Sequence, residues 1–352
     1  MANNHHADTI PVRADERFDE ERLATYLNGK LPGATHPPLV RQFGGGAANL
    51  TYLLDYGTHQ YVLRRPPLGP VAKSAHDMAR EYKVLSVLYQ AFPYAPRAYL
   101  YCDDSSIIGA DFFVMERRQG VVVRRSMPPE FAAMHDAPRC MSAALVDALA
   151  EFHAVDYQAI GLGDLGEPKG FITRQIEGWH RRWHAAKTKE VADMESVYLW
   201  LKSHQPLTTS YSLVHNDFKL DNVMFDASDP GKIVAVFDWD MCTLGDPLND
   251  LGALLSYWSE STDPPYFQGM AMMPTGIRFM TRRELIERYA LKSGRSIHDI
   301  HFYHALGLFR LTVIIAQIYV RYHRGQTQDQ RFEAFGRMIP LMAHAALEVA
   351  GA

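Results

Sequence analysis

The chain has 352 residues, of which 47% are hydrophobic and 22% are charged, and its formal net charge is -4. A chain of this length can bury a sizeable core and exceeds the usual size of one compact domain. The slightly acidic balance lacks the basic excess that neutralises a phosphate backbone, so we expect no nucleic-acid partner.

Cysteine usage and the apolar runs indicate a reducing, aqueous compartment. The three cysteines, Cys102, Cys140 and Cys242, are odd in number and too widely spaced for a zinc pattern. Residues 1–8 lack the apolar run of a signal peptide, and the most apolar helical stretch, Leu306–Val320, is shorter than a membrane span requires. We therefore expect a cytoplasmic protein with no membrane partner, whose oligomeric state the sequence leaves open.

The first third of the chain has the pattern of short strands around one helix. Strands are predicted over Leu39–Phe43, Leu50–Tyr56, Gln60–Arg65, Arg97–Tyr101 and Asp111–Glu116, and a helix over His76–Tyr89. The strands are β-prone runs separated by turn residues, whereas the helix repeats apolar residues at helical intervals. These elements predict an antiparallel meander with one helix, in a first lobe of residues 1–117.

The rest of the chain, residues 118–352, is predicted to form a mostly helical lobe after a connector at Arg117–Gly120. Helices are predicted over Met141–His153, Ile172–His184, Leu248–Trp258, Arg282–Leu291, His298–Arg321 and Gln330–Val349. Two short apolar runs, Asn222–Phe225 and Lys232–Phe237, interrupt the helices and predict a hairpin. The fold class is therefore α+β.

The strongest chemical signal is the segment His215–Asn222, followed by Asp238. Asp217 and Asn222 are five residues apart, as in the kinase loop H-R-D-x-x-x-x-N, and Asp238 follows sixteen residues after Asn222. Phosphoryl transfer needs one base to orient a hydroxyl and oxygen ligands for magnesium. The alternative is that these are ordinary turn residues, but three polar groups would then have reached these intervals by accident.

With these motifs the sequence resembles the aminoglycoside phosphotransferase family, which includes choline-kinase-like enzymes and shares the two-lobed protein-kinase fold. The resemblance covers nearly the whole chain. It implies a small-molecule kinase that uses ATP and Mg²⁺. It also implies that Asp217 is the catalytic base, that Asn222 and Asp238 bind magnesium, and that His215 supports the catalytic loop.

A glycine-rich turn and its neighbours are candidate nucleotide-binding residues. Gly45, Gly46 and Asn49 lie in the segment Gly44–Asn49, where small side chains would let backbone N–H groups approach phosphates. A plain hairpin turn is the alternative. The family usually has serine where this chain has Ala48, so the turn would have to rely on its backbone.

Five further residues match kinase features. Arg64 falls where kinases place the lysine of V-A-I-K, and Glu81 in the next helix should pair with it. The alternative is a surface salt bridge. Met115 and Glu116 end the strand where kinases receive adenine through backbone groups. Lys219 could touch the transferred phosphate, although a solvated lysine explains it nearly as well.

Other polar residues are interpreted as structural. Asp246 is expected to cap the helix that follows it, and Asp250 to brace the catalytic loop by hydrogen bonds to its backbone. His5 and His6 lie in a polar tail, and the remaining histidines show no H-E-x-x-H spacing. We therefore expect no structural metal.

The charge of the C-terminal helices constrains the acceptor. From Glu260 to the end there are eight Asp and Glu residues against eleven Lys and Arg residues, whereas polycationic aminoglycosides need a carboxylate-rich pocket. Through Phe309–Leu311 and Gln317–Arg321 the chain resembles the kinase domains fused to acyl-CoA dehydrogenases. This resemblance implies a hydroxyacyl-CoA or another anionic small molecule as acceptor.

Arg310, Gln317 and Arg321 share one helical face and are candidate acceptor-binding residues. The alternative is that both arginines form structural ion pairs with acidic neighbours. A function of another class also stays open, namely a nucleotide-binding regulatory module without turnover, because Arg64 and Ala48 depart from the usual pattern. An aminoglycoside- or choline-type kinase is a further alternative.

Overall fold

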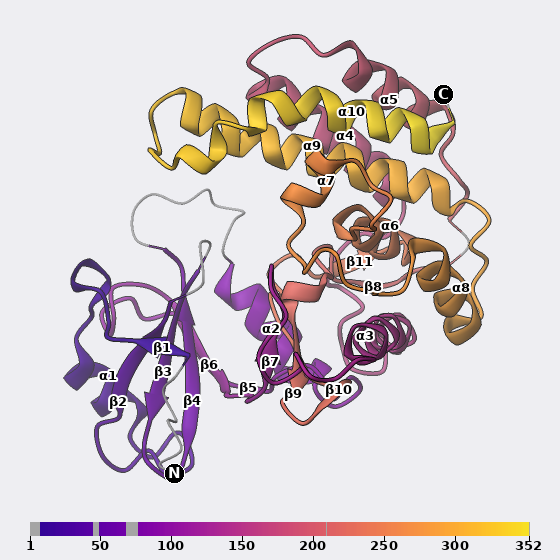
Figure 1. The fold of residues 1–352 in the computed structure, drawn as a ribbon. Helices are drawn as coiled ribbons and strands as arrows, with labels where there is room; N and C mark the ends of the chain where they lie inside the picture. The colour runs from indigo at the N-terminus through magenta and orange to yellow at the C-terminus, as the bar shows by residue number, and fades with distance from the viewer. Residues whose placement is uncertain (1–7, 45–48, 68–76, 209, 352) are drawn as a thin grey trace. The chain divides into compact units, whose positions relative to one another are not determined.

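The computed structural model describes residues 8–44, 49–67, 77–208 and 210–351. The chain forms two compact units (Figure 1). The first unit holds Met1–Gln119 together with Ala235–Asp240, and the second holds Gly120–Val234 and Met241–Ala352. The short segment Ala235–Asp240 therefore belongs to the first unit although it comes late in the chain. The expected division into residues 1–117 and 118–352 has one boundary and does not include this return.

A six-stranded antiparallel sheet forms the first unit, with its strands in the order β1-β2-β3-β4-β6-β5. The strands are β1 (Thr9–Ile10), β2 (Leu39–Phe43), β3 (Leu50–Asp55), β4 (Gln60–Arg65), β5 (Ala98–Cys102) and β6 (Phe112–Glu116). At the β3–β4 turn Gly57 has a φ of +82° and donates its backbone N–H to Asp55 Oδ1 at 2.7 Å. The predicted antiparallel meander is confirmed.

Two helices accompany this sheet (Figure 1). They are α1 (Glu20–Leu27) and α2 (Met78–Leu88), and a 3₁₀ turn, η1, covers Ala14–Glu16. Asp19 and Asp77 cap the two helices by accepting hydrogen bonds from the backbone nitrogens of Arg22 and Arg80, both at 2.9 Å. The sequence predicted α2 but not α1 or β1, because eight mostly polar residues and a two-residue strand carry little periodic signal.

Helix α9 lies at the centre of the second unit. The helices are α3 (Ala137–His153), α4 (Phe171–Ala186), α5 (Ala192–Ser203), α6 (Leu248–Tyr257), α7 (Pro265–Met270), α8 (Arg282–Ser293), α9 (Ile300–His323) and α10 (Phe335–Ala350). Helix α9 packs against α4, α5, α6 and α10 (Figure 1). At its contact with α6 a side chain at Gly252 would collide with the Tyr303 carbonyl, so glycine sets the close approach.

The predicted helix over Gln330–Val349 is wrong in its first part. A 3₁₀ turn, η3 (Gln330–Phe332), comes first, and α10 begins at Phe335. The turn forms because Asp329 Oδ1 accepts a hydrogen bond from the Arg331 backbone nitrogen at 3.1 Å. Helices α5 and α7 were not predicted.

Helix α9 is long and apolar enough to cross a membrane when only length and composition are considered. It has 24 residues and extends beyond both ends of the apolar stretch singled out in the sequence. However, 67% of its most apolar window is buried inside the structure. Leu306, Phe309 and Val313 belong to the core of the helical unit. This burial is that of a core helix.

Short strands lie among the helices of the second unit, and some of them flank its functional loops. Strands β7 (Val121–Val122), β9 (Val223–Asp226) and β10 (Asp229–Val236) form a sheet in the order β10-β9-β7, and β8 (Ser212–Val214) pairs with β11 (Thr243–Gly245). The predicted hairpin corresponds to β9 and β10. Asn222 lies before it, in a 3₁₀ turn η2 (Leu220–Asn222), and Phe237 lies after it. Strands β7, β8 and β11 are too short for a sequence pattern to reveal.

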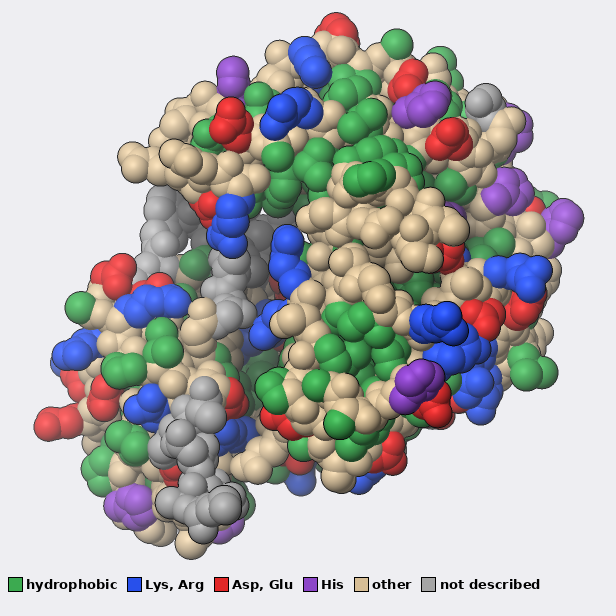
Figure 2. All heavy atoms as spheres, in the orientation of Figure 1, with side chains coloured by type: hydrophobic (Ala, Val, Ile, Leu, Met, Phe, Trp, Pro, Cys, Tyr) green, Lys and Arg blue, Asp and Glu red, His purple; other side chains and the backbone are tan. Residues whose placement is uncertain are grey.

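The visible face of the second unit carries both signs of charge. Figure 2 shows its basic and acidic side chains interspersed with hydrophobic ones. This mixture agrees with the small net charge of the chain.

Candidate active site

The predicted catalytic loop, residues 215–222, connects β8 to β9. Its first turn is held by Asp250 of α6, which is fully buried. Asp250 Oδ2 accepts a hydrogen bond from the His215 backbone nitrogen at 2.6 Å, and Oδ1 accepts one from the Asn216 backbone nitrogen at 2.8 Å. The predicted bracing of the loop by Asp250 is confirmed. Asp246 Oδ1 also accepts from the Leu248 nitrogen at 3.0 Å, at the first residue of α6, although the residue directly before the helix is Pro247 and not Asp246 as expected.

A buried histidine completes this support. His153 Nε2 lies 3.3 Å from Asp250 Oδ2, and its Nδ1 accepts a hydrogen bond from the Tyr289 hydroxyl at 2.7 Å. Burial lowers the pKa of His153, so a neutral ring donates from Nε2. Burial alone would raise the pKa of Asp250, but its hydrogen bonds from His153 and His215 outweigh burial and the pKa is lowered. The loop is therefore anchored on a buried, charged carboxylate.

Backbone geometry fixes the residue before the candidate base. Asn216 has a φ of +64°, which is uncommon for a residue other than glycine. Its Nδ2 donates to the Met241 carbonyl at 2.9 Å, and its Oδ1 accepts from Asn249 Nδ2 at 3.1 Å. These two bonds hold the left-handed turn, as expected where strain is stored at a functional site.

His215 has no solvent exposure. Its Nδ1 accepts a hydrogen bond from the Asp217 backbone nitrogen at 3.3 Å, and its ring packs edge-on against Phe152 and Phe218. A side chain buried in this way positions Asp217 and does not reach a reactant. These contacts agree with the expected role of His215 in supporting the catalytic loop.

The structure brings Asp217, Lys219 and Asn222 together. Lys219 Nζ lies 2.6 Å from Asp217 Oδ2, and Asn222 Nδ2 donates to both the carbonyl oxygen and Oδ2 of Asp217 at 2.9 Å. Burial would lower the pKa of Lys219, but the neighbouring Asp217 carboxylate more than offsets this and raises it. Lys219 therefore stays charged beside the carboxylate. The solvated-lysine interpretation is wrong, because its side chain is only 18% exposed.

The contacts of Asn222 orient its amide group. The Asp217 backbone carbonyl can only accept a hydrogen bond, so the atom of the Asn222 amide that contacts it must be the donor Nδ2. The amide oxygen Oδ1 of Asn222 therefore points away from Asp217. An amide oxygen is a ligand that magnesium accepts.

In the first unit Arg64 of β4 joins two carboxylates. Its Nη1 lies 3.0 Å from Glu81 Oε1, and its Nη2 lies 2.7 Å from Asp238 Oδ1. The predicted pairing of Arg64 with Glu81 is confirmed, and the alternative of a surface salt bridge is wrong because both side chains are buried. Burial would lower the pKa of Arg64, but the two carboxylates raise it.

Glu81 is almost fully buried on α2. Burial raises the pKa of Glu81 to about 7, Arg64 opposes that rise, and the nearby Asp238 and Asp240 add to it. The group thus carries more negative than positive charge. A cation at Asp238 would relieve this excess.

Asp238 lies in the late segment of the first unit and has a φ of +68°. The segment is held by a hydrogen bond from the Val236 backbone nitrogen to the Tyr94 carbonyl at 2.8 Å, and by the packing of Trp239 against Phe92. Asp238 side-chain exposure is 33%, so its carboxylate is accessible to a ligand.

The remaining candidate nucleotide-binding residues all belong to the first unit. Gly45 and Gly46 lie outside the described residues, whereas Asn49 is buried directly before β3. Met115 is buried in β6. Glu116 is engaged by Arg97 and Arg118: its Oε2 accepts from the Arg97 nitrogen at 3.2 Å and lies 3.1 Å from Arg118 Nη2. The Glu116 side chain is thus already paired with groups of the first unit.

The three candidate acceptor residues of α9 are not alike. Arg310 is buried, with 6% exposure, whereas Gln317 and Arg321 are exposed. The three side chains thus have different surroundings, and the expected role of Gln317 and Arg321 in acceptor binding stays a prediction. Arg310 lies over the Trp179 ring of α4, 5.3 Å from its centroid, and its Nη2 contacts Met241 Sδ at 3.9 Å.

The surroundings of Arg310 contradict the alternative that this residue forms a structural ion pair. Within residues 8–44, 49–67, 77–208 and 210–351 no carboxylate lies within ion-pair distance of it, and its buried Nε has no hydrogen-bond partner. Arg182 lies over the same Trp179 ring, 4.4 Å from its centroid. Partial burial first, and then the charges of Arg310 and Arg181, lower the pKa of Arg182. The region is therefore electropositive.

Tyr257, the last residue of α6, connects Arg310 with the catalytic loop. Lys219 Nζ lies over its ring, 5.1 Å from the centroid. Burial raises the pKa of Tyr257, Asp217 adds to the rise, and Arg310 and Lys219 oppose it. Sequence reasoning missed Tyr257, Trp179 and Arg182, because each lies on a regular helix and no motif marks it.

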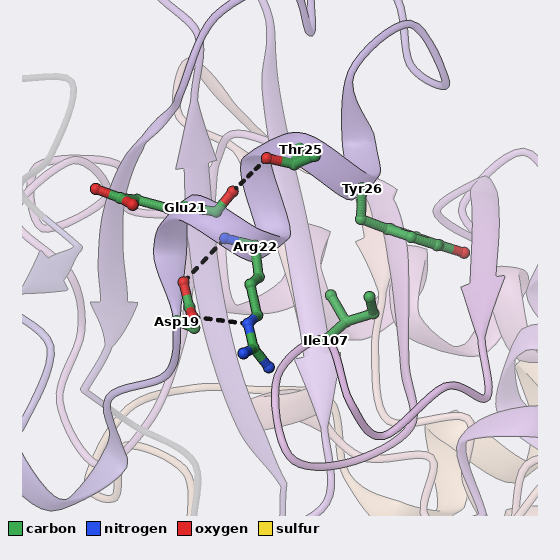
Figure 3. A pocket seen from close by; sticks show the side chains of 6 residues that line it. All are labelled: Asp19, Glu21, Arg22, Thr25, Tyr26 and Ile107. Carbon is green, nitrogen blue, oxygen red and sulfur yellow. Dashed lines mark hydrogen bonds and ion pairs between the residues drawn. The ribbon is translucent and has the colours of Figure 1, made fainter.

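A hollow of about 460 Å³ in the first unit is not part of this site. Asp19, Glu21, Arg22, Thr25, Tyr26 and Ile107 line it (Figure 3). Two of its charged groups pair with each other, since Arg22 Nε lies 3.1 Å from Asp19 Oδ2. None of the predicted site residues contributes to it.

The fold and the Asp217 loop together define a kinase-like phosphotransferase. The chain belongs to the phosphotransferase enzyme family, whose sequence pattern matches residues 39–280.

Full-length relatives are larger than this chain. It is 33% identical over 351 residues to acyl-CoA dehydrogenase family member 11 of Gallus gallus, covering 97% of this chain and 44% of that protein. It is 32% identical over 346 residues to family member 10 of Mus musculus, covering 97% of this chain and 32% of that protein. The chain thus spans less than half the length of these relatives.

Solved structures share its fold. A protein of Ralstonia eutropha, described as a candidate aminoglycoside phosphotransferase, superposes with a TM-score of 0.81 at 31% identity, covering 95% of this chain and 99% of that one. An aminoglycoside phosphotransferase solved in a ternary complex with AMP-PNP and hygromycin B has a TM-score of 0.60 at 17% identity, covering 94% and 99%. The kinase-like fold inferred from the sequence is confirmed.

Proposed function

We propose that the protein is an ATP-dependent small-molecule kinase that transfers the γ-phosphoryl group to a hydroxyl of an anionic acceptor. The observation that carries this proposal is the arrangement of Asp217, Lys219 and Asn222 on a loop braced by Asp250. Within a phosphotransferase family this arrangement supplies the groups that phosphoryl transfer needs.

In the proposed reaction Asp217 orients the acceptor hydroxyl and accepts its proton. The acceptor oxygen forms a bond to the γ-phosphorus while the bond from that phosphorus to the departing ADP oxygen breaks. Lys219 remains charged beside Asp217, where it can offset negative charge on the transferred group. The solved relative bound to AMP-PNP supports ATP as donor.

Each unit offers a type of ligand that magnesium accepts. Asn222 offers an amide oxygen, and Asp238 offers a carboxylate beside an excess of acidic charge. Magnesium would supply charge neutralisation across the phosphates. In this proposal Arg64 orients phosphate through the guanidinium that Glu81 and Asp238 hold.

The acceptor is proposed to be anionic because Arg310 is buried without a carboxylate among the described side chains. An uncompensated buried charge is costly, and an acceptor carboxylate or phosphate would relieve that cost. Since the long relatives are acyl-CoA dehydrogenase family members, a hydroxyacyl-CoA is the acceptor that we propose to test first.

A coupled ADP-release assay tests the function. The panel contains hydroxy acids, their CoA thioesters, aminoglycosides and choline, and mass spectrometry detects the phosphorylated product. We expect ADP release only with an anionic hydroxylated acceptor. ATP binding without transfer to any compound would instead support a regulatory module, and turnover of an aminoglycoside would overturn the acceptor class.

Arg64→Met should reduce ATP affinity and transfer more than Arg64→Lys does. Methionine leaves Glu81 and Asp238 without their shared cation, whereas lysine keeps one charge but cannot reach both carboxylates in the same way. Nucleotide titration and initial rates measure the difference, with Arg22→Met, which removes an exposed pair with Asp19, as control. Parent-like behaviour of both Arg64 variants would show that Arg64 has no part in phosphate binding.

Arg310→Met should raise the acceptor KM by about tenfold or more and leave the KM for ATP unchanged, since a charge-assisted hydrogen bond contributes about 1.5–3 kcal/mol. Stability should be kept or increased, because the substitution removes an uncompensated buried charge. Arg324→Met is the control, as Arg324 is exposed directly after the end of the same helix and is not a candidate acceptor residue. A fall in Tm with unchanged acceptor kinetics would contradict the binding role.

A further inference from the structure

Helices α4 and α5 bring two histidines and a glutamate together, apart from every residue assigned above. His180 and His184 are four residues apart on α4 and therefore share a face, and Glu195 lies on α5. The two Nε2 atoms are 3.1 Å apart. Glu195 Oε2 lies 2.9 Å from His180 Nε2, and Glu195 Oε1 lies 3.3 Å from His184 Nε2. One ligand atom from each residue thus lies within 4.8 Å of the other two.

These distances are those between neighbouring ligands of one metal ion. With metal–ligand bonds of about 2.0–2.1 Å, tetrahedral ligand atoms stand roughly 3.4 Å apart, and a smaller bond angle shortens that separation. The separation of the two nitrogens and the distance from each nitrogen to its nearer Glu195 oxygen are close to this value, the two nitrogens facing different oxygens of the carboxylate. The Nε2 atoms of both histidines also point toward each other and toward the Glu195 carboxylate. Imidazole nitrogens converge in this way when they coordinate one metal ion.

Ordinary ion pairing does not explain the whole cluster. Two protonated histidines would pair with Glu195 but would repel one another across 3.1 Å. Two neutral histidines can share only one proton between their Nε2 atoms. Moreover, Glu195 Oε1 is buried and, despite its 3.3 Å separation from His184 Nε2, makes no hydrogen bond in the part of the chain that the structure describes. A divalent cation satisfies both nitrogens and this oxygen at once.

The surroundings are built to hold the ring of His180. It stacks on Tyr198 of α5, with centroids 3.5 Å apart and planes 2° from parallel. The Tyr198 hydroxyl donates to Glu177, whose carboxylate also lies 3.4 Å from Lys202 Nζ. His180 is 16% exposed, whereas His184 and Glu195 are 45% and 40% exposed, so an ion can enter from solvent.

The geometry points to a transition-metal site formed by His180, His184 and Glu195, with zinc as the ion that best suits two imidazoles and one carboxylate. Magnesium and calcium prefer all-oxygen ligands, which separates this site from the proposed nucleotide magnesium. Its place between α4 and α5 gives the metal a structural role, because it ties together two helices that both pack on α9. The sequence expectation of no structural metal rested on the absence of H-E-x-x-H or comparable zinc spacing, and it overlooked an i,i+4 pair of histidines completed from another helix.

Cobalt binding by the whole protein tests the site. The parent for this experiment carries His5→Ala and His6→Ala, so that the tail histidines bind no metal, and the buffer contains excess Mg²⁺. We expect about one equivalent of Co²⁺ with the visible absorption bands of a low-symmetry, nitrogen-ligated ion, and displacement of those bands by Zn²⁺. Zn²⁺ should also raise Tm, because a ligand that binds only the folded state stabilises it.

Two variants and a control decide the assignment. His184→Gln and Glu195→Gln should each weaken Co²⁺ binding by at least about tenfold and abolish the Zn²⁺-dependent rise in Tm. His298→Gln, which removes an exposed histidine outside the cluster, should behave as the parent. Both variants alter exposed groups, and circular dichroism confirms their folding. Absence of Co²⁺ binding by the parent, or unchanged binding in both folded variants, would overturn the proposal.

Discussion

Asp217→Asn is expected to reduce phosphoryl transfer by ~10²–10⁴-fold, the usual contribution of a general base. The amide keeps the size of the side chain and can still accept from Asn222, but it cannot take the hydroxyl proton or hold the charge of Lys219. ATP affinity should change little, because the carboxylate acts on the acceptor. Single-turnover transfer and equilibrium nucleotide binding measure the two effects separately.

Asp226→Asn is a matched control for this substitution. Asp226 also pairs with a lysine, Lys232, at 2.9 Å, but it lies at the end of β9 and outside the catalytic loop. We expect its transfer rate to equal that of the parent. Near-normal turnover of Asp217→Asn would remove the assignment of Asp217 as base, whatever the control shows.

Asp250→Ala should cost about 3–5 kcal/mol of unfolding free energy, the usual effect of removing one partner from a buried charged group. The substitution leaves the backbone nitrogens of His215 and Asn216 and the Nε2 of His153 without their acceptor. The catalytic loop begins at these nitrogens, so transfer should also fall in the protein that remains folded. Urea unfolding and initial rates below the transition measure the two losses.

An exposed aspartate supplies the comparison for Asp250. Asp136 is 82% exposed, and its carboxylate pairs only with the exposed His135 among the contacts of the described residues, so Asp136→Ala should leave stability unchanged. If Asp250→Ala unfolds at the same urea concentration as Asp136→Ala, then the catalytic loop does not depend on the buried carboxylate.

The sequence predicted those elements whose signal is local. Strands β2, β3 and β4 follow from β-prone runs between turns, and α2 follows from apolar residues at helical spacing. The pairing of Arg64 with Glu81 and the bracing by Asp250 were likewise predicted, because motif spacing places these residues. Elements of two or three residues, such as β7 and β8, are set by pairing across the fold and leave no periodic trace.

Contacts between residues on different helices could not be predicted from the sequence. Helical spacing placed Arg310 and Arg321 on one face, but it does not reveal that Arg310 is buried by other helices while Arg321 is exposed. Tyr257 and Trp179 approach Arg310 from α6 and α4, and Glu195 approaches α4 from α5. These contacts depend on tertiary packing, which residue spacing within one helix does not encode.

The late segment Ala235–Asp240 affects how the protein can be divided or recombined. Because it belongs to the first unit, the chain passes between units after Gln119, after Val234 and after Asp240. A fragment that ends at Gln119 would lack the strand contact to Tyr94 and the carboxylate that Asp238 gives to Arg64. Functional chimaeras between relatives should therefore exchange residues 1–119 and 235–240 together, because the two segments form one structural unit.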